Sequence, residues 1–409
     1  MVTIGGSRRG FEIVQRVVRK LGGSSFGSAA SEESSAEDFQ NLSDVLSEFS
    51  VFYRIFPPRR LRLVLKTIKA VGEGGYGRVF TATPTEAGLR RVPVLTADQV
   101  YAVKLLKQAG TSQFASTISA HVNRTSKEKL CESLALLRSQ EAHEAHVVTI
   151  FAIFEEVPWK VYILMEYLQG PDLFDFLALR IRPVDEFQAR TLAKQIFAAL
   201  AFLHGRVGLI HRDVKPENLC FARQFDREAI GEPMPPIKLL DFGLAWLLPE
   251  PVTESTARDM QPMPRAGTRL YMAPEIWDGW LGPSSDVWSA GIVVHLLLSA
   301  DLPFQLGKSK DCAAAIATGA LDFAAEGWAT VGPDARDFVA RALTKATAAR
   351  ATVAELTQSS WLRSEHGPGP QGQSGGSRRA GCIPSLTSRS KAECTSAVMW
   401  NFIPDAGPM

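Results

Sequence analysis

Cysteine is scarce in this sequence of 409 residues, and the spacing of the few present excludes two kinds of chemistry. The five cysteines form no C-x-x-C pair and no even set of the kind that cross-links small secreted proteins. We therefore expect a reducing compartment, the cytoplasm, with neither a structural zinc site nor thiol catalysis. The cysteines are Cys131, Cys220, Cys312, Cys382 and Cys394.

The chain also lacks an excess of charge of either sign. It has 45 Lys and Arg residues against 43 Asp and Glu residues, which gives a formal net charge of +2. No overall electric field would attract a polyanion, so we expect no nucleic-acid partner. Any partner has to be inferred from local sites.

No hydrophobic run is long enough to cross a bilayer. The longest in the C-terminal half, "VWSAGIVVHLLLSADLPF" from Val287, is interrupted by His295, Ser289 and Ser299. This run predicts a buried core helix and no transmembrane segment.

Composition divides the chain into three parts. Residues 1–63 combine an Arg- and Ser-rich start with the acidic stretch "SEESSAED", and residues 363–409 are rich in Gly, Ser and Pro. We expect a partly flexible N-terminal extension, which includes a basic amphipathic pattern, and a flexible tail. Residues 64–362 are expected to hold the fold.

The apolar pattern within residues 64–362 changes partway along. Short β-branched runs bounded by Gly and Pro predict a strand-rich lobe over 64–168, and helical spacing predicts a helix-rich lobe over 169–362. The expected class is α+β with two lobes. The clearest helical stripe consists of Phe187, Leu192, Ile196, Leu200 and Leu203.

The stretch "LIHRDVKPENLCF" gathers an acid, a cation and an amide in one turn: Asp213, Lys215 and Asn218. A surface turn could hold these residues by chance, because Pro and Asn are common in turns. Other parts of the sequence must decide whether they act together.

A glycine-rich stretch, "VGEGGYGRVF", lies between two strand-like runs and has the spacing G-x-G-x-x-G. Glycines let a backbone approach phosphate oxygens that a Cβ atom would exclude. A dinucleotide-binding Rossmann motif would need a helix next, whereas "RVFTAT" has the content of a strand. The pattern favours a hairpin that covers phosphates.

Two further residues complete a candidate phosphate and metal site. Lys104 in "YAVKLL" would ordinarily extend to solvent, but beside a glycine loop it becomes a candidate phosphate ligand. Asp241 in "IKLLDFGLAW" ends a strand-like run, and with Asn218 it supplies the oxygen ligands that Mg²⁺ prefers. By contrast, His143 and His146 lack a third ligand motif, so we expect no zinc there.

The glycine loop, "AVK", "HRDVKPEN", "DFG" and "APE" occur in an order and at distances that resemble the eukaryotic protein kinase domain. The resemblance covers residues 64–362, and Arg350 and Trp361 match its closing Arg and Trp. "YLQGPDLFDFL", "GTRLYMAPE" and "SSWL" are most similar to the calcium/calmodulin-dependent and calcium-dependent kinase group. No EF-hand loop is present, so we expect no intrinsic Ca²⁺ binding; a calmodulin-type partner stays open.

The resemblance implies a Ser/Thr kinase that uses ATP and Mg²⁺. Lys104 would hold the α- and β-phosphates, and Asp241 and Asn218 would bind the metal ions. Asp213 would accept the proton of the substrate hydroxyl, and Lys215 would stabilise the transferring phosphoryl group.

The resemblance also implies the remaining nucleotide contacts. Glu132, four residues before Leu136, is favoured over Glu128 as the partner of Lys104. Met165 matches the gatekeeper position, and Glu166 and Leu168 would offer backbone hydrogen bonds to adenine. The phosphate flap would comprise Gly72, Glu73, Gly74, Gly75 and Gly77, and the apolar walls Val79, Ala102 and Cys220.

Substrate and regulatory residues follow from the same resemblance. Asp172 and Glu217 match positions that hold an Arg three residues before the target, which predicts R-x-x-S/T substrates. Thr268 is expected to face Asp213 and Lys215. The candidate phosphorylation sites, which would pair with Arg212, are Thr253, Ser255 and Thr256.

Two alternatives remain beside an active protein kinase. A pseudokinase scaffold would have no chemical need for Lys104, Asp213, Asn218 and Asp241 together, and a small-molecule kinase fits "GTRLYMAPE" less well. For location, residues 1–30 hold few acids and several serines, so an organelle signal is the alternative to the cytoplasm.

Overall fold

The computed structural model describes residues 64–74, 77–92, 95–106, 135–156, 160–178, 184–225, 234–248, 250–263, 265–304 and 312–364. The chain divides into two compact units, one formed by residues 1–35 and 380–409 and the other by residues 36–379. All described residues belong to the second unit.

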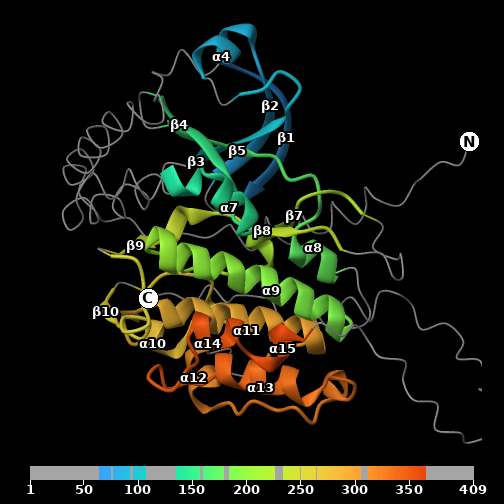
Figure 1. Cartoon of the computed structure of the whole chain (residues 1–409), viewed down its shortest axis with the longest axis vertical. Helices are drawn as coiled ribbons and strands as arrows, with labels where there is room; N and C mark the ends of the chain where they lie inside the picture. The colour runs from blue at the N-terminus through green and yellow to red at the C-terminus, as the bar shows by residue number, and fades with distance from the viewer. Residues whose placement is uncertain are drawn as a thin grey trace, which may run out of the picture. The chain divides into compact units, whose positions relative to one another are not determined.

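A five-stranded antiparallel sheet forms the first part of this unit (Figure 1). Its order is β1-β2-β3-β5-β4, so the glycine-rich stretch is a hairpin between β1 and β2, as the sequence predicts, and no helix follows it. The strands are β1 (Leu65–Gly74), β2 (Gly77–Pro84), β3 (Tyr101–Leu106), β4 (Ile150–Glu156) and β5 (Lys160–Glu166).

Alternation along β3 separates the core from the site. Tyr101 and Val103 point into an apolar cluster on one face of the sheet, where Tyr101 has no exposed surface. Ala102 and Lys104 therefore point to the opposite face, because successive strand residues alternate. The pleat that points Tyr101 and Val103 into the apolar cluster thus points Lys104 to the other face, where the candidate site lies.

A short helix between β2 and β3 was not anticipated from the sequence. Helix α4 (Glu86–Arg91) begins at Thr85, whose hydroxyl group accepts a hydrogen bond from the Gly88 N–H at 3.0 Å. A Cβ atom at Gly88 would lie 2.1 Å from the Val64 carbonyl oxygen, so the backbones can approach only because this residue is glycine. The helix covers the edge of the apolar cluster with Leu89.

Helices dominate the second part, where α9 (Glu186–Phe202) and α11 (Pro283–Ser299) lie side by side (Figure 1). Every residue of α11 is buried, which confirms the predicted core helix. The predicted stripe is buried from Leu192 onward, whereas Phe187, in the first turn of α9, is 45% exposed beside the Arg190 guanidinium. The α+β class is confirmed.

The remaining elements are short. The helices are α7 (Gln140–Glu144), α8 (Leu173–Ala178), α10 (Pro274–Trp277), α12 (Cys312–Thr318), α13 (Pro333–Ala342), α14 (Val353–Thr357) and α15 (Ser360–Arg363). The strands pair as β6 (Leu209–Ile210) with β9 (Trp246–Leu247), β7 (Leu219–Phe221) with β8 (Ile237–Leu239), and β10 (Gln261–Pro262) with β11 (Trp280–Leu281). Single turns are η2 (Leu203–Val207), η3 (Pro216–Asn218), η4 (Phe242–Leu244), η5 (Arg269–Tyr271) and η6 (Glu326–Trp328).

Within the described ranges, no helix combines the length and the apolar character that a membrane crossing requires.

A buried ion pair joins two distant parts of the helical region. Arg350 donates to both carboxylate oxygens of Glu275 at 2.7 and 2.9 Å, and its guanidinium lies 5.0 Å from the centre of the Trp288 ring. The Arg350 side chain has no exposed surface. A buried carboxylate whose partner is removed keeps its desolvation penalty without the compensating charge.

We expect Arg350→Met to lower the free energy of unfolding by about 3–5 kcal/mol, because it leaves the Glu275 carboxylate buried without its cation. Urea unfolding followed by circular dichroism measures the loss. Arg363→Met, at an exposed arginine of α15, is the matched control. Equal urea midpoints for both variants would contradict the assigned contribution of the pair.

Candidate active site

The predicted catalytic turn is a closed network around Asp213. One carboxylate oxygen, Oδ1, accepts hydrogen bonds from the Thr268 N–H at 3.0 Å and the Thr268 hydroxyl group at 2.7 Å. The other oxygen, Oδ2, lies 2.8 Å from Lys215 Nζ. Lys215 also donates to the Thr268 hydroxyl oxygen at 2.7 Å, so Thr268 faces both residues as expected.

Asn218 is oriented by the same network. Its Nδ2 atom donates to the Asp213 carbonyl oxygen at 2.7 Å and to Asp213 Oδ2 at 3.1 Å. Because the amide nitrogen donates both of these hydrogen bonds to Asp213, the side-chain oxygen is the atom that a metal ion would bind. The donor set thus fits Mg²⁺, which prefers oxygen ligands.

A buried carboxylate, Asp286, binds the backbone of the catalytic turn. Its role was not predicted from the sequence. Asp286, in the first turn of α11, accepts hydrogen bonds from the backbone N–H groups of His211 and Arg212 at 2.7 and 2.8 Å. His204 Nε2 lies 2.8 Å from the same carboxylate. Burial opposes ionisation of Asp286, but these hydrogen bonds and the histidine outweigh it and lower its pKa. An acid at the start of an apolar helix was the available signal.

Arg212 shows what this support achieves. Its φ angle is 69°, in the left-handed region that a non-glycine residue rarely adopts. Such conformations persist where the surroundings compensate for their cost, and here Asp286 accepts hydrogen bonds from the consecutive N–H groups of His211 and Arg212, directly before this φ angle.

Asp241 and Lys104 form an ion pair with 2.5 Å between Asp241 Oδ1 and Lys104 Nζ. Burial alone would raise the pKa of Asp241, yet the Lys104 ammonium group outweighs burial and lowers it, so the carboxylate is ionised. Asp241 also has a left-handed backbone, with φ at 67°. Its side chain is 23% exposed, which leaves it accessible to a metal ion.

The Asp241 segment is joined to the catalytic turn. His211 Nε2 lies 2.8 Å from the Leu240 carbonyl oxygen, and the rings of His211 and Phe242 contact each other edge to face at 5.4 Å. The structure therefore brings Lys104, Asp213, Asn218 and Asp241 into one connected arrangement. Glu132, the predicted partner of Lys104, lies outside the described residues, as does Gly75.

The flap and the apolar walls lie in the sheet. Gly72, Glu73, Gly74 and Gly77 belong to the β1–β2 hairpin, where Gly74 pairs with Gly77. Buried Ala102, Val148 and Met165 form an apolar cluster, against which Val79, Tyr167, Leu240 and Phe242 pack. The predicted wall residues Val79 of β2 and Ala102 of β3 are therefore in contact through one apolar cluster. Val148 belongs to the same cluster and was not predicted from the sequence.

The segment after β5 runs along β7. Gln169 and Gly170 donate backbone hydrogen bonds to Ala222 and Phe221 at 3.1 Å each, which positions neighbouring Leu168 at the end of the sheet. The Cys220 thiol lies 3.5 Å from the Gly170 carbonyl oxygen, and burial followed by the charge of Asp172 raises its pKa to about 12. A protonated thiol in this place is consistent with a wall residue and not with a nucleophile.

Asp172 and Glu217 lie near each other at the edge of the site. Asp172 Oδ1 accepts a hydrogen bond from the Asp175 N–H at 2.7 Å and so caps α8. Burial, with the charges of Asp175 and Glu217, raises the pKa of Asp172 to about 7. Partial desolvation of the carboxyl group also raises the pKa of Glu217, although that residue as a whole is exposed.

The three candidate phosphorylation sites cluster in one exposed turn. The Thr253 hydroxyl group lies 2.9 Å from that of Ser255 and 3.2 Å from that of Thr256. Two residues further along, Arg258 donates to both carboxylate oxygens of Glu355 at 2.8 Å each, which ties this segment to α14. Phosphorylation of the three hydroxyl groups stays a prediction.

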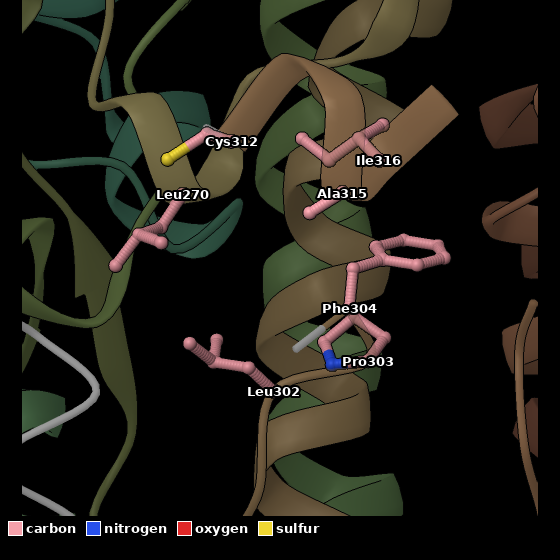
Figure 2. Close-up of a pocket in the computed structure, with 7 residues that line it drawn as sticks. All are labelled: Leu270, Leu302, Pro303, Phe304, Cys312, Ala315 and Ile316. Atoms are coloured by element: carbon pink, nitrogen blue, oxygen red, sulfur yellow. The ribbon is translucent and has the colours of Figure 1, made fainter. Parts of the chain in front are cut away.

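An apolar pocket lies beside Leu270 of η5, two residues after Thr268 (Figure 2). Leu270 contributes one wall, and helix α12 and the residues after α11 contribute the others. This pocket was not predicted from the sequence. Its lining consists of Leu270, Leu302, Pro303, Phe304, Cys312, Ala315 and Ile316.

Comparison with known proteins agrees with this geometry. The family model described as the protein kinase domain matches residues 65–362, and the chain belongs to this family. CDPK-related kinase 4 of Arabidopsis thaliana is 28% identical over 298 residues, which is 73% of this chain and 44% of that protein. Calcium-dependent protein kinase 22 of Oryza sativa subsp. japonica is 32% identical over 203 residues, 50% of this chain and 32% of that protein.

A third relative, calcium-dependent protein kinase 2 of Arabidopsis thaliana, is 29% identical over 300 residues, 68% of this chain and 44% of that protein. The predicted likeness to the calcium-dependent group is confirmed. The chain spans less than half the length of these relatives.

Asp172→Asn is expected to raise the melting temperature more at about pH 8 than at about pH 5. Ionised Asp172 destabilises the folded state above its raised pKa, and this cost fades as the pH falls toward the ordinary value for Asp. Asn removes the charge and still caps α8.

Thermal unfolding at the two pH values measures this difference. Asp185→Asn is the control, because Asp185 is an exposed cap of α9 that accepts from the Gln188 N–H in the same way. A gain for Asp172→Asn that did not depend on pH would contradict the assignment.

Proposed function

We propose that this protein is an ATP-dependent protein serine/threonine kinase. The observation that carries the proposal is the network in which Asp213 contacts Lys215, Thr268 and Asn218 while Lys104 pairs with Asp241. A protein that only binds partners has no chemical need for a base, two cations and two oxygen ligands in one arrangement. The pseudokinase alternative has no observation in its favour.

ATP is the expected phosphate donor. The glycine hairpin would cover its phosphates and Lys104 would neutralise them, while the base would lie against Val79, Ala102, Met165 and Cys220. Asp241 and Asn218 would hold Mg²⁺. A bound Mg²⁺ ion would neutralise the negative charge on the phosphate oxygens. The backbone of Glu166 and Leu168 is proposed to bind adenine.

Asp213 is proposed to orient the substrate hydroxyl group and accept its proton. Two hydrogen bonds from Thr268 fix the position of Oδ1, so the carboxylate cannot rotate away from the incoming hydroxyl group. Lys215, 2.8 Å from Oδ2, would reach the phosphoryl group being transferred and stabilise its negative charge. Lys215 stands where the family's Ser/Thr kinases have a lysine, which supports serine and threonine as acceptors.

Three points of regulation and location belong to the proposal. Phosphate on Thr253, Ser255 or Thr256 would pair with Arg212 and order this segment. Two of the relatives are named calcium-dependent, and a calmodulin-type partner stays an open part of the proposal. The cysteine pattern favours the cytoplasm, with residues 1–63 and 363–409 as extensions of the catalytic domain.

Asp213→Asn tests the catalytic proposal, because the amide has nearly the same size but cannot accept the hydroxyl proton. We expect kcat to fall by roughly 10²–10⁴-fold. The assay is phosphate transfer from radiolabelled ATP to a basic serine peptide with Mg²⁺, and Asp278→Asn, at an exposed aspartate, is the control. Wild-type protein that transferred no more phosphate than Asp213→Asn would favour the pseudokinase alternative.

Substrates are proposed to carry Arg three residues before the target Ser or Thr. The charge of Glu217 contributes to the raised pKa of Asp172 at one edge of the site, and a guanidinium can bridge two carboxylates through charged hydrogen bonds. Leu296 stands where an acid would favour a second Arg, so no strong demand for one is expected.

Replacing Asp172 with Ala is expected to weaken transition-state binding of an R-x-x-S peptide by roughly 1–3 kcal/mol, the range for a lost charged hydrogen bond. The same peptide with Ala in place of Arg should show little difference between wild type and variant. The measurement is kcat/KM for both peptides and both proteins. A positional peptide library without a basic preference at this site would contradict the proposal.

A further inference from the structure

A charged cluster lies between β8 and the end of β5, next to the residues proposed to bind adenine. Lys238, the middle residue of β8, has a side chain that is only 3% exposed. Its Nζ atom lies 2.6 Å from Glu166 Oε1 and 2.7 Å from His143 Nδ1. The sequence alone indicated no role for Lys238 or for the Glu166 side chain.

The chemistry of the ammonium group defines the state of its partners. Burial lowers the pKa of Lys238, and Glu166 opposes this effect. An ammonium group has only donors, so Lys238 would donate to both Glu166 Oε1 and His143 Nδ1. Glu166 and His143 thus both satisfy one buried cation.

The cluster joins three segments that are far apart in the sequence. Glu166 Oε1 also accepts a hydrogen bond from the Thr149 N–H at 2.7 Å, and the Glu166 N–H donates to the Thr149 carbonyl oxygen at 3.0 Å. The residues before Thr149 pair with β8, since Leu239 donates to the His146 carbonyl oxygen at 2.8 Å and Val148 donates to that of Leu239 at 3.0 Å.

Both ends of this cluster lead directly to the proposed nucleotide site. Glu166 follows Met165, which forms the apolar wall with Ala102. Lys238 is three residues before Asp241, whose carboxylate pairs with Lys104. A displacement of β8 relative to the end of β5 would therefore change the position of Asp241 relative to the adenine wall.

We propose that Lys238 is a positioning residue whose buried ion pair with Glu166 sets the spacing between the adenine-binding segment and Asp241. A charged hydrogen bond at 2.6 Å fixes a distance and a direction, whereas apolar side chains of similar volume would fill the space without fixing either. The inference rests on the proposed use of ATP, but it concerns nucleotide binding and not the acceptor.

Four variants test this assignment. Lys238→Met and Glu166→Gln remove one charge each, and Lys238→Arg and Glu166→Asp keep the charge but change the reach of the side chain. Lys194→Met, at an exposed lysine of α9, is the matched control. Thermal unfolding first establishes which variants are folded at the assay temperature.

Calorimetry with a non-hydrolysable ATP analogue and Mg²⁺ is the main readout, together with KM for ATP and kcat. We expect Kd and KM for the nucleotide to rise about tenfold in each folded variant at Lys238 or Glu166, with a smaller change in kcat. The double variant Lys238→Met with Glu166→Gln is expected to be no weaker than either single variant, because both remove the same contact. Lys194→Met should match the wild type.

A merely structural role for the pair would lower the melting temperature and leave Kd unchanged well below it. Nucleotide Kd within about twofold of the wild type in the folded variants, or effects of the two single changes that add in the double variant, would overturn the assignment. If charge removal prevents folding, Lys238→Arg and Glu166→Asp decide by the same criterion. Wild-type protein that binds no nucleotide would refute the proposed function instead, so the two failures are distinguishable.

Discussion

The arrangement of the proposed catalytic residues depends on the buried carboxylate of Asp286. It binds the backbone N–H groups of His211 and Arg212 and so holds Arg212 at a positive φ angle, immediately before Asp213. Asp286 itself belongs to α11, whose residues are all buried. The catalytic turn is therefore anchored in a fully buried helix, and changes in core packing would reach Asp213 through two hydrogen bonds.

The segment that carries Asp241 is held from two sides. On one side, His211 joins the catalytic turn to Leu240 by a hydrogen bond of 2.8 Å. On the other side, Lys238 joins β8 to Glu166 at the end of β5. These contacts place Asp241 between the catalytic turn and the adenine wall, which supports the proposal that β8 couples the two.

The sequence predicted the features that depend on local pattern. The strand-like run that contains Lys104 and the apolar run from Val287 are visible in the sequence itself, because strand and helix patterns depend on the spacing of nearby residues. Features that depend on distant partners were missed: Lys238 looks like an ordinary strand lysine until Glu166 and His143, 72 and 95 residues away, are brought beside it. Helix α4 is too short to show a period, and Glu132 falls outside the described residues.

The acids around the site differ in how their charge is compensated. Asp213 and Asp241 each have a lysine ammonium group within 2.8 Å. For Asp172 and Glu217, burial raises the pKa of both carboxyl groups, that of Asp172 to about 7, and at Glu217 it outweighs the charge of Lys215, which lowers the pKa. An ionised pair at this edge costs stability in the isolated protein, and a guanidinium from outside would relieve that cost by supplying a further cation. The same electrostatic imbalance supports the proposal of a basic polypeptide as the substrate.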